Sequence, residues 1–167
     1  DGREQVAGFH MMGDLLGMDA ISAGRHMCDT VALEDCEVCE IPFSSLEQLS
    51  RELAPLQHQL HRIMSREIAR DHGVMLLLGS MRAEERLAVF LLNLSQRFAA
   101  RGYSSNEFHL RMTREEIGSF LGLKLETVSR TLSHFQAEGL ISVRNKHLCI
   151  LKMDALKEMI SHHGCSG

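Results

Sequence analysis

Four polar residues between positions 126 and 130 have the chemistry needed to read base edges in duplex DNA. Arg130 can donate two hydrogen bonds to guanine O6 and N7, and Glu126 can accept one from cytosine N4. Ser129 and Thr127 can contact a base edge or a thymine methyl group. On a helix, Glu126, Ser129 and Arg130 would share one face because they are three and four positions apart. The pattern therefore indicates a candidate surface for the major groove.

The surrounding sequence predicts two short helices joined by a tight turn. Thr113 and Glu116 have the spacing of a capping box, which would open the first helix. Gly122 permits the left-handed backbone that ends this helix, and the second helix would run from about residue 125 to Gly139. Its inward face is expected to be apolar and to consist of Leu125, Val128, Leu132 and Phe135. This arrangement is typical of a helix-turn-helix.

Further side chains nearby carry the charge or hydroxyl group needed to hold phosphate. Phosphate contacts position a protein on duplex DNA without reading its sequence. A hairpin predicted over residues 140–151, turning at residues 144–146, would add a wing beside the helices. We assign supporting or phosphate contacts to Thr127, Ser133, Lys124, Arg114, Arg144 and Lys146.

The same pattern has a plainer interpretation as a two-helix corner of the kind found in enzymes and helical bundles. An arginine on an outer helix face is often only solvated, and Glu126 would interact favourably with a helix N-terminus in any protein. The distribution of charge favours DNA binding. Residues 1–100 carry a net charge of −6 and residues 101–167 carry +2, within a total of −4. Such a division is expected when one part of a chain meets a polyanion.

Composition argues against several other classes of protein. The longest strongly apolar stretch, Val74–Leu78, is far shorter than the roughly 20 residues of a membrane span, so no membrane helix is expected. No signature of a Ser-His-Asp triad, a glycine-rich phosphate loop or a His-x-x-x-His motif is visible, so we expect that the chain is not an enzyme. An odd number of cysteines fits a reduced, cytoplasmic protein: Cys28, Cys36, Cys39, Cys149 and Cys165.

Residues 1–48 are short apolar runs broken by glycine and polar residues. Their alternation, for example over residues 38–43, predicts β-strands and tight turns that form part of a β-roll or barrel. Because the first residues have no initiator methionine and no signal core, we expect that an N-terminal segment is missing. The predicted fold class is α+β, with a partial β-roll, a long dimerisation helix and a winged helix-turn-helix domain. The expected divisions are residues 1–48, 49–82 and 83–167.

A long helix is predicted from Pro55 to Gly79, and a second over residues 83–100. The long helix has two apolar stripes, of which one can face its own domain and the other a partner helix. The partner stripe comprises His61, Met64, Ile68, Asp71, Met75 and Leu78. A single broad face packed on one core would explain the pattern equally well. In a two-fold dimer Asp71 would meet its symmetry mate, so the dimer would be weak and switchable.

The sequence resembles the CRP/FNR superfamily of dimeric bacterial transcription regulators, specifically the FNR-type anaerobic regulators. The resemblance covers essentially the whole chain. It rests on GFHMMGDLLGMDAI and VCEIPF in the first third, on LLLGSMRAEERLAVFLLNLSQRFAARG across the helices, and on MTREEIGSFLGLKLETVSRTLSHFQAEGLI. It implies a β-roll of the cyclic-nucleotide-binding type. A related protein of the superfamily, CAP, is a known helix-turn-helix protein that places its second helix in the major groove.

The resemblance also implies roles for individual residues. Glu126, Ser129 and Arg130 would read each TTGAT-like half-site of a palindrome, and RNA polymerase would be a further partner. Ile68 and Asp71 would sit in the dimer interface. Cys39 would be one ligand of an oxygen-labile [4Fe–4S] cluster. The other three cluster cysteines of the family have no counterpart here, so this chain alone cannot hold the cluster through four thiolates.

Two alternatives stay open beside an oxygen-responsive regulator. One is a ligand-responsive regulator of the CRP type without an iron–sulfur cluster. For cAMP, such a protein would need a Gly-Glu-Leu turn and an Arg-Ser/Thr-Ala triplet, whereas this chain has GDLLG and MCDTVAL, so we expect no cAMP binding. The other alternative is a protein-interaction module whose helical corner contacts RNA polymerase or another protein instead of DNA.

Overall fold

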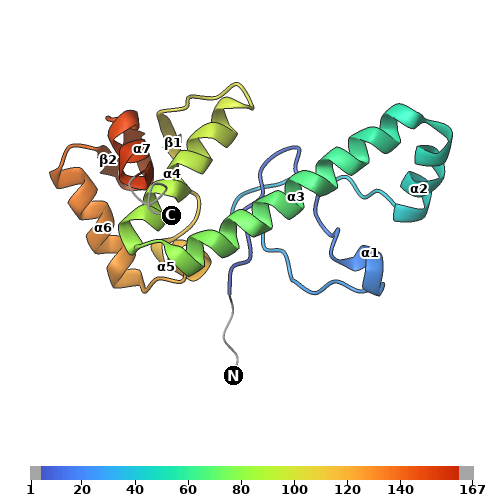
Figure 1. Cartoon of the computed structure of the whole chain (residues 1–167), viewed down its shortest axis with the longest axis horizontal. Coiled ribbons are helices and arrows are strands. Elements are labelled where there is room, and N and C mark those ends of the chain that lie inside the picture. Colours follow the sequence, from blue (N-terminus) through green and yellow to red (C-terminus); the bar gives the residue numbers. More distant parts are fainter. Residues whose placement is uncertain (1–4, 162–167) are drawn as a thin grey trace. The chain divides into compact units, whose positions relative to one another are not determined.

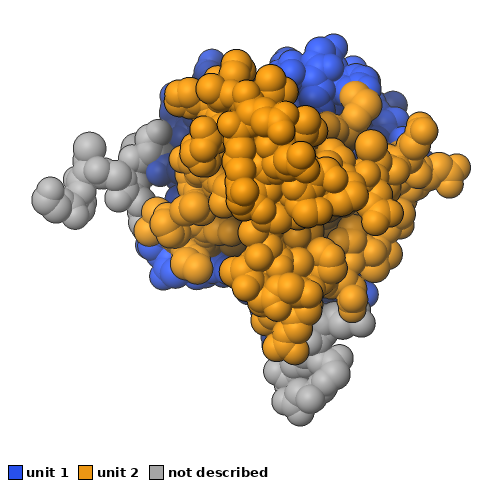
Figure 2. Space-filling model, turned by 90° about the vertical axis from the view of Figure 1, so that its right-hand side faces the viewer, with its two compact units in different colours: residues 1–6, 77–167 blue, residues 7–76 orange. Residues whose placement is uncertain are grey.

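The computed structural model of this chain describes residues 5–161. These residues divide into two compact units (Figure 2). The C-terminal unit comprises residues 77–161 with residues 5 and 6, and the N-terminal unit comprises residues 7–76. Helix α3 (Ala54–Ser80) contributes its last residues to the C-terminal unit and all its others to the N-terminal unit.

The C-terminal unit consists of helices packed with a small antiparallel sheet (Figure 1). Its elements after α3 are α4 (Ala83–Ala99), β1 (Glu107–His109), α5 (Arg114–Leu121), α6 (Leu125–Ala137), β2 (Ile141–Arg144), β3 (His147–Ile150) and α7 (Met153–Ser161). The helices from α4 to α6 and the β2–β3 hairpin confirm the sequence prediction. β1 and α7 were not predicted.

The sheet has the strand order β1-β3-β2, and both pairings are antiparallel. Phe108 of β1 lies opposite Leu148 of β3, and both side chains are buried. A three-residue strand with one buried side chain is too short for alternation to reveal it. Asn145 makes the hairpin turn with a φ of 58°, a conformation that asparagine tolerates.

The core of the C-terminal unit collects side chains from every layer. Helix α4 contacts α6, α7 and β1, and α5 packs on α6. Side chains that are almost completely buried include Leu87, Leu91, Ile117, Leu121, Val128, Leu132, Phe135, Ile141, Leu148 and Leu156. Three of the four predicted inward residues of α6 are among them. The fourth prediction was wrong, because Leu125 is the first residue of the helix and is 45% exposed.

The turn between α5 and α6 is built by caps and two glycines. Thr113 and Glu116 form the predicted capping box at the start of α5. Gly122 caps the end of α5 with a φ of 63°, in the left-handed region that favours glycine. A Cβ on Gly118 would lie 2.6 Å from the carbonyl oxygen of Leu123, so only glycine lets the turn fold back so closely on α5. Sequence reasoning had missed Gly118.

In the N-terminal unit, α1 (Ala20–Ala23) and α2 (Phe43–Glu52) precede α3. The β-strands predicted within residues 1–48 are not formed in residues 5–48, where the backbone outside α1 and α2 is irregular. An alternating pattern becomes a strand only where a neighbouring strand supplies ladder hydrogen bonds, and no two of these segments pair. Local contacts hold the irregular backbone instead. The Asp19 carboxylate accepts a 2.6 Å hydrogen bond from the N–H of Met27, and this bond, aided by His26, lowers the pKa of Asp19 from 3.8.

Helix α3 keeps the two predicted stripes distinct. On the stripe that can face its own domain, Leu56, Leu60, Ile63 and Val74 are half-buried, and Leu77 is buried. The second stripe is exposed from His61 to Met75. Within residues 5–161, no helix is both long and apolar enough to cross a lipid bilayer.

Candidate nucleic-acid interface

The predicted base-reading residues lie on the N-terminal half of α6. Glu126 and Arg130 are exposed and Ser129 is half-buried, so none of the three is in the core. Within the described chain, neither Glu126 nor Arg130 forms an ion pair. Their charges are therefore not neutralised by the protein itself, and both remain available to base edges or phosphates.

The predicted supporting residues divide into free and engaged groups. Lys124, Arg114 and Arg144 are exposed, and Thr127 is half-buried. The Ser133 hydroxyl donates a 3.0 Å hydrogen bond to the Ser129 carbonyl oxygen one turn earlier. The Lys146 ammonium donates to the Arg111 carbonyl oxygen at 3.3 Å, which ties the wing to the segment before α5. Four of the six supporting residues are therefore accessible, whereas Ser133 and Lys146 already have partners within the protein.

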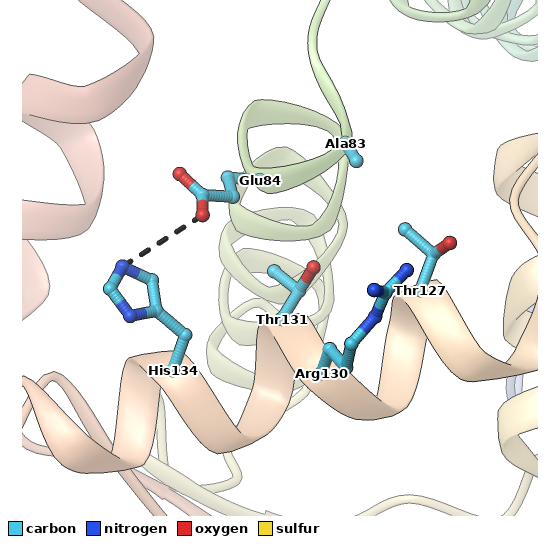
Figure 3. Close-up of a pocket in the computed structure, with 6 residues that line it drawn as sticks. All are labelled: Ala83, Glu84, Thr127, Arg130, Thr131 and His134. Atoms are coloured by element: carbon cyan, nitrogen blue, oxygen red, sulfur yellow. Dashed lines mark ion pairs between the residues drawn. The ribbon is translucent and has the colours of Figure 1, made fainter.

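A hollow of about 310 Å³ lies between α6 and the first turn of α4 (Figure 3). Its lining consists of Ala83, Glu84, Thr127, Arg130, Thr131 and His134. Nε2 of His134 lies 3.8 Å from Oε1 of Glu84, and both side chains are about half exposed. Exposed pairs of this kind contribute little to stability. The hollow carries charges of both signs, with Arg130 on one helix and Glu84 on the other.

Sequence reasoning missed the residue that connects several elements near this surface, Arg86 of α4. Its guanidinium donates hydrogen bonds to the carbonyl oxygens of Met81, Leu121 and Leu78. The sequence around Arg86, between Glu85 and Leu87, did not indicate this role, because an arginine early in an amphipathic helix is usually a surface residue. Only the fold brings the three carbonyl groups together.

The stripe predicted for a partner helix is open along most of α3. Ile68 is 56% exposed and Met75 is 69% exposed, and Met64, His61 and Asp71 are also exposed. Leu78, the last member, is half-buried. Its Cδ2 atom lies 3.3 Å from the position that a Cβ on Gly122 would occupy, so this side chain packs at the helix-turn-helix turn.

The cysteines in the described part of the chain do not form a metal centre by themselves. Cys28, Cys36 and Cys39 are exposed and Cys149 is half-buried, whereas Cys165 lies outside the described residues. The Cys36 thiol donates to the Glu34 carbonyl oxygen at 3.0 Å. Within residues 5–161, no three His, Cys, Asp or Glu side chains are grouped so that they could hold a metal ion.

Two family descriptions match the sequence. The Crp-like helix-turn-helix domain matches residues 85–159, the region of α4 to α7. The cyclic nucleotide-binding domain matches residues 1–52. The second match supports the expected type of N-terminal domain even though its strands are not formed in residues 5–48. Neither match tests the expectation that cAMP is not bound.

Several curated proteins are similar over nearly the whole chain. The transcriptional regulatory protein btr of Bordetella pertussis is 49% identical, over 98% of this chain and 68% of that protein. The fumarate and nitrate reduction regulatory protein of Escherichia coli is 50% identical, over 96% of this chain and 64% of that protein. The chain spans about two thirds of the length of these relatives. Among solved structures, FixK2 from Bradyrhizobium japonicum is similar with a TM-score of 0.64 and 32% identity, over 70% of this chain and 57% of that one.

Proposed function

This chain belongs to the CRP/FNR family of transcription regulators, of FNR type, and we propose that it reads a palindromic DNA site as a homodimer through α6. Membership of a family of regulators also agrees with the expectation that the chain is not an enzyme. The observation that carries the proposal is the exposed face of α6, where Glu126 and Arg130 have no ion-pair partner among the described residues.

The proposed reading of DNA assigns one task to each group of residues. Arg130 donates two hydrogen bonds to a guanine, Glu126 accepts from a cytosine, and Ser129 contacts a neighbouring base edge, in each TTGAT-like half-site. Lys124, Arg114 and Arg144 hold phosphates, and Lys146 and Ser133 support the wing and the helix. The hydroxyl of Thr127 lies at the same end of α6, beside Arg130 in Figure 3. These phosphate contacts fix the register in which the base contacts form.

The proposed partner of α3 is a second copy of this chain. The stripe from His61 to Met75 has large apolar side chains in solvent, and it follows the seven-residue spacing of a coiled-coil seam. In the symmetric pair, Asp71 faces its own copy. Two like charges about 4 Å apart repel by roughly 1 kcal/mol in water and about 4 kcal/mol at an effective dielectric constant of 20. The repulsion keeps the dimer weak, so a modest additional interaction can switch it.

We extend the proposal to a response to oxygen or redox state. The support is the similarity to fumarate and nitrate reduction regulatory proteins and the exposure of Cys39. The described residues do not fit a complete [4Fe–4S] cluster, because no three ligand-type side chains are grouped among them. Cys39 is therefore proposed as a single thiolate ligand and no more. We also propose RNA polymerase as a partner and the cytoplasm as the location, where a regulator meets both DNA and the polymerase.

We propose that the three parts of the chain have the boundaries expected from the sequence and a separate function each. Residues 1–48 belong to the sensor domain, residues 49–82 form the dimerisation region, and residues 83–167 bind DNA. The C-terminal unit begins a few residues earlier, at Leu77, because the last turn of α3 packs with the helix-turn-helix.

A gel-shift titration tests the DNA-binding proposal. The probes are a duplex with two TTGAT-like half-sites in two-fold symmetry and a duplex of the same composition in scrambled order. At physiological salt, a specific regulator binds its site about 10³-fold or more tightly than other DNA. Equal affinity for the two duplexes would contradict the proposal and would favour a module that contacts another protein.

A further inference from the structure

Arg86 joins two parts of the C-terminal unit that are far apart in sequence: the end of α3 with its link to α4, and the end of α5. Its Nη2 atom donates to the Leu78 carbonyl oxygen at 2.7 Å, and its Nη1 atom donates to the Leu121 carbonyl oxygen at 3.0 Å. Its Nε atom donates to the Met81 carbonyl oxygen at 2.9 Å. Leu78 is in the last turn of α3, Met81 is in the link to α4, and Leu121 is the last residue of α5.

The carbonyl groups of Leu78 and Leu121 need a donor from outside the hydrogen-bond ladder of their own helix. The last four carbonyl groups of a helix have no partner within the helix, and Leu78 and Leu121 both lie in such a terminal turn. A guanidinium is the side chain that suits them, because it is planar and presents its donors in a fixed fork. Hydrogen bonds from a charged donor are about twice as strong as neutral ones. Arg86 is half-buried, so water competes less for these bonds than at an exposed site.

Close packing reinforces the same junction. A Cβ on Gly122 would lie 3.3 Å from Cδ2 of Leu78 and 3.4 Å from Nη1 of Arg86. The end of α3, the guanidinium and the turn that leads into α6 are therefore in contact around one glycine. The only covalent route between the end of α3 and α6 runs through α4, β1 and α5, whereas the Arg86 bonds connect the end of α3 directly to the end of α5, next to the turn that leads into α6.

We propose that Arg86 is a positioning residue that fixes the helix-turn-helix to the end of α3 and so sets the half-site spacing that the dimer accepts. This inference rests on the proposed function. If two copies pair along α3, the separation of their recognition helices is defined only when each helix-turn-helix is held rigidly to its own α3. Half-site spacing in helix-turn-helix dimers is a geometric property of this kind.

The test compares Arg86→Met and Arg86→Lys with the unmodified 167-residue chain. Methionine keeps the stem but removes every donor, and one lysine ammonium cannot span three separated carbonyl groups. Arg101→Met is the matched control, because Arg101, just after the end of α4, donates to the Arg97 carbonyl oxygen in the last turn of that helix at 2.9 Å. Affinity is measured by fluorescence anisotropy on a palindrome, on a palindrome with two base pairs added between the half-sites, a shift of about 7 Å, and on a single half-site.

The expected result separates positioning from folding. The unmodified chain and Arg101→Met prefer the shorter palindrome strongly, and Arg86→Met loses at least about fivefold of that preference, the lower end of usual coupling between sites. Its affinity for the single half-site stays within about twofold, as expected for a retained fold, and Arg86→Lys is intermediate. If Arg86→Met does not fold, Arg86→Lys decides the question.

Two outcomes would overturn the inference. One is an unchanged spacing preference in the folded Arg86 variants. The other is an equal loss of affinity on all three duplexes, which would make the role of Arg86 merely structural. If the unmodified chain shows no preference for the palindrome over scrambled DNA, the proposed function fails, and the failure is then distinct from that of the Arg86 inference.

Discussion

The two units of this chain treat their apolar side chains in opposite ways. In the C-terminal unit, Phe135, Leu87 and Leu148 are completely buried, and α5 is capped at both ends. In residues 7–76, Ser50 is the one buried side chain, and large apolar groups such as Val38 and Met75 are mostly exposed. The C-terminal unit therefore buries its apolar pattern within itself, whereas residues 7–76 leave most of theirs exposed.

The contrast has a functional counterpart. A unit that closes its own core can hold Glu126, Ser129 and Arg130 on a rigid helix, as a base-reading surface requires. An exposed stripe on α3 suits an interaction that forms and breaks, since nothing in that helix depends on it for burial. We therefore expect the base-reading surface of α6 to be rigid and the dimer interface on α3 to form and break.

Removing a large core side chain gives the largest expected effect. Phe135→Ala should lower the free energy of unfolding of the C-terminal unit by about 3–5 kcal/mol, because Phe135 is fully buried and its loss leaves a cavity. Ile68→Ala is the matched change in the N-terminal unit and should alter the free energy of unfolding of that unit by less than about 0.5 kcal/mol, because Ile68 is 56% exposed. Urea denaturation followed by circular dichroism measures both. Similar losses of unfolding free energy in the two variants would contradict the difference in burial between the two units.

The next effect concerns the interface between copies. Asp71→Ala should strengthen dimerisation by about 1–4 kcal/mol, since it removes the repulsion between symmetry mates. Glu52→Ala, which removes a charge from the end of α2, should leave dimerisation unchanged. Sedimentation equilibrium in air gives the dissociation constants. A dimer no tighter than that of the parent chain would place Asp71 away from the interface.

A third change tests whether α6 contacts the bases of DNA. Arg130→Ala should cost about 1–3 kcal/mol of binding and relax the preference at one base pair in each half-site. Lys157→Ala, on α7 and paired with Asp154, serves as the control. Titration of duplexes that carry single base-pair changes measures the effect. A uniform loss on every duplex would mean that Arg130 contacts only phosphate.

A smaller effect is expected at the cap of α5. Thr113→Ala removes the oxygen that accepts from the Glu116 N–H, and should lower the free energy of unfolding by about 1 kcal/mol. Thr113→Ser keeps the acceptor and should recover most of the loss. If both variants lose the same amount, the cap does not stabilise the helix as described.

The smallest effect concerns pH in the N-terminal unit. Because the folded pKa of Asp19 is lowered below 3.8, its hydrogen bonds stabilise the local loop above pH 3.8 and are lost as pH falls through the folded pKa. The Met27 amide resonance should report a midpoint below 3.8 in an NMR titration, and Asp19→Asn should abolish the transition. A midpoint at or above pH 3.8 would mean that these hydrogen bonds do not stabilise the Asp19 carboxylate in solution.

The sequence predicted the structure of the C-terminal unit better than that of the N-terminal unit. The helix-turn-helix was predictable because its signals are local: the Thr113 cap, the Gly122 turn and the spacing of Val128, Leu132 and Phe135. The strands expected within residues 1–48 did not form among the described residues, because a strand depends on a neighbour that alternation does not specify. The roles of Gly118 and Arg86 were not predictable, since each depends on atoms that only the tertiary fold brings within contact.

We propose that two copies of α6 enter the major groove of one DNA site. A hydroxyl-radical footprint of the chain on the TTGAT-like palindrome tests it most directly. We expect two protected segments related by two-fold symmetry, with centres about 10 base pairs apart or a multiple of that distance. Protection of one half-site alone, or of the duplex without symmetry, would contradict it.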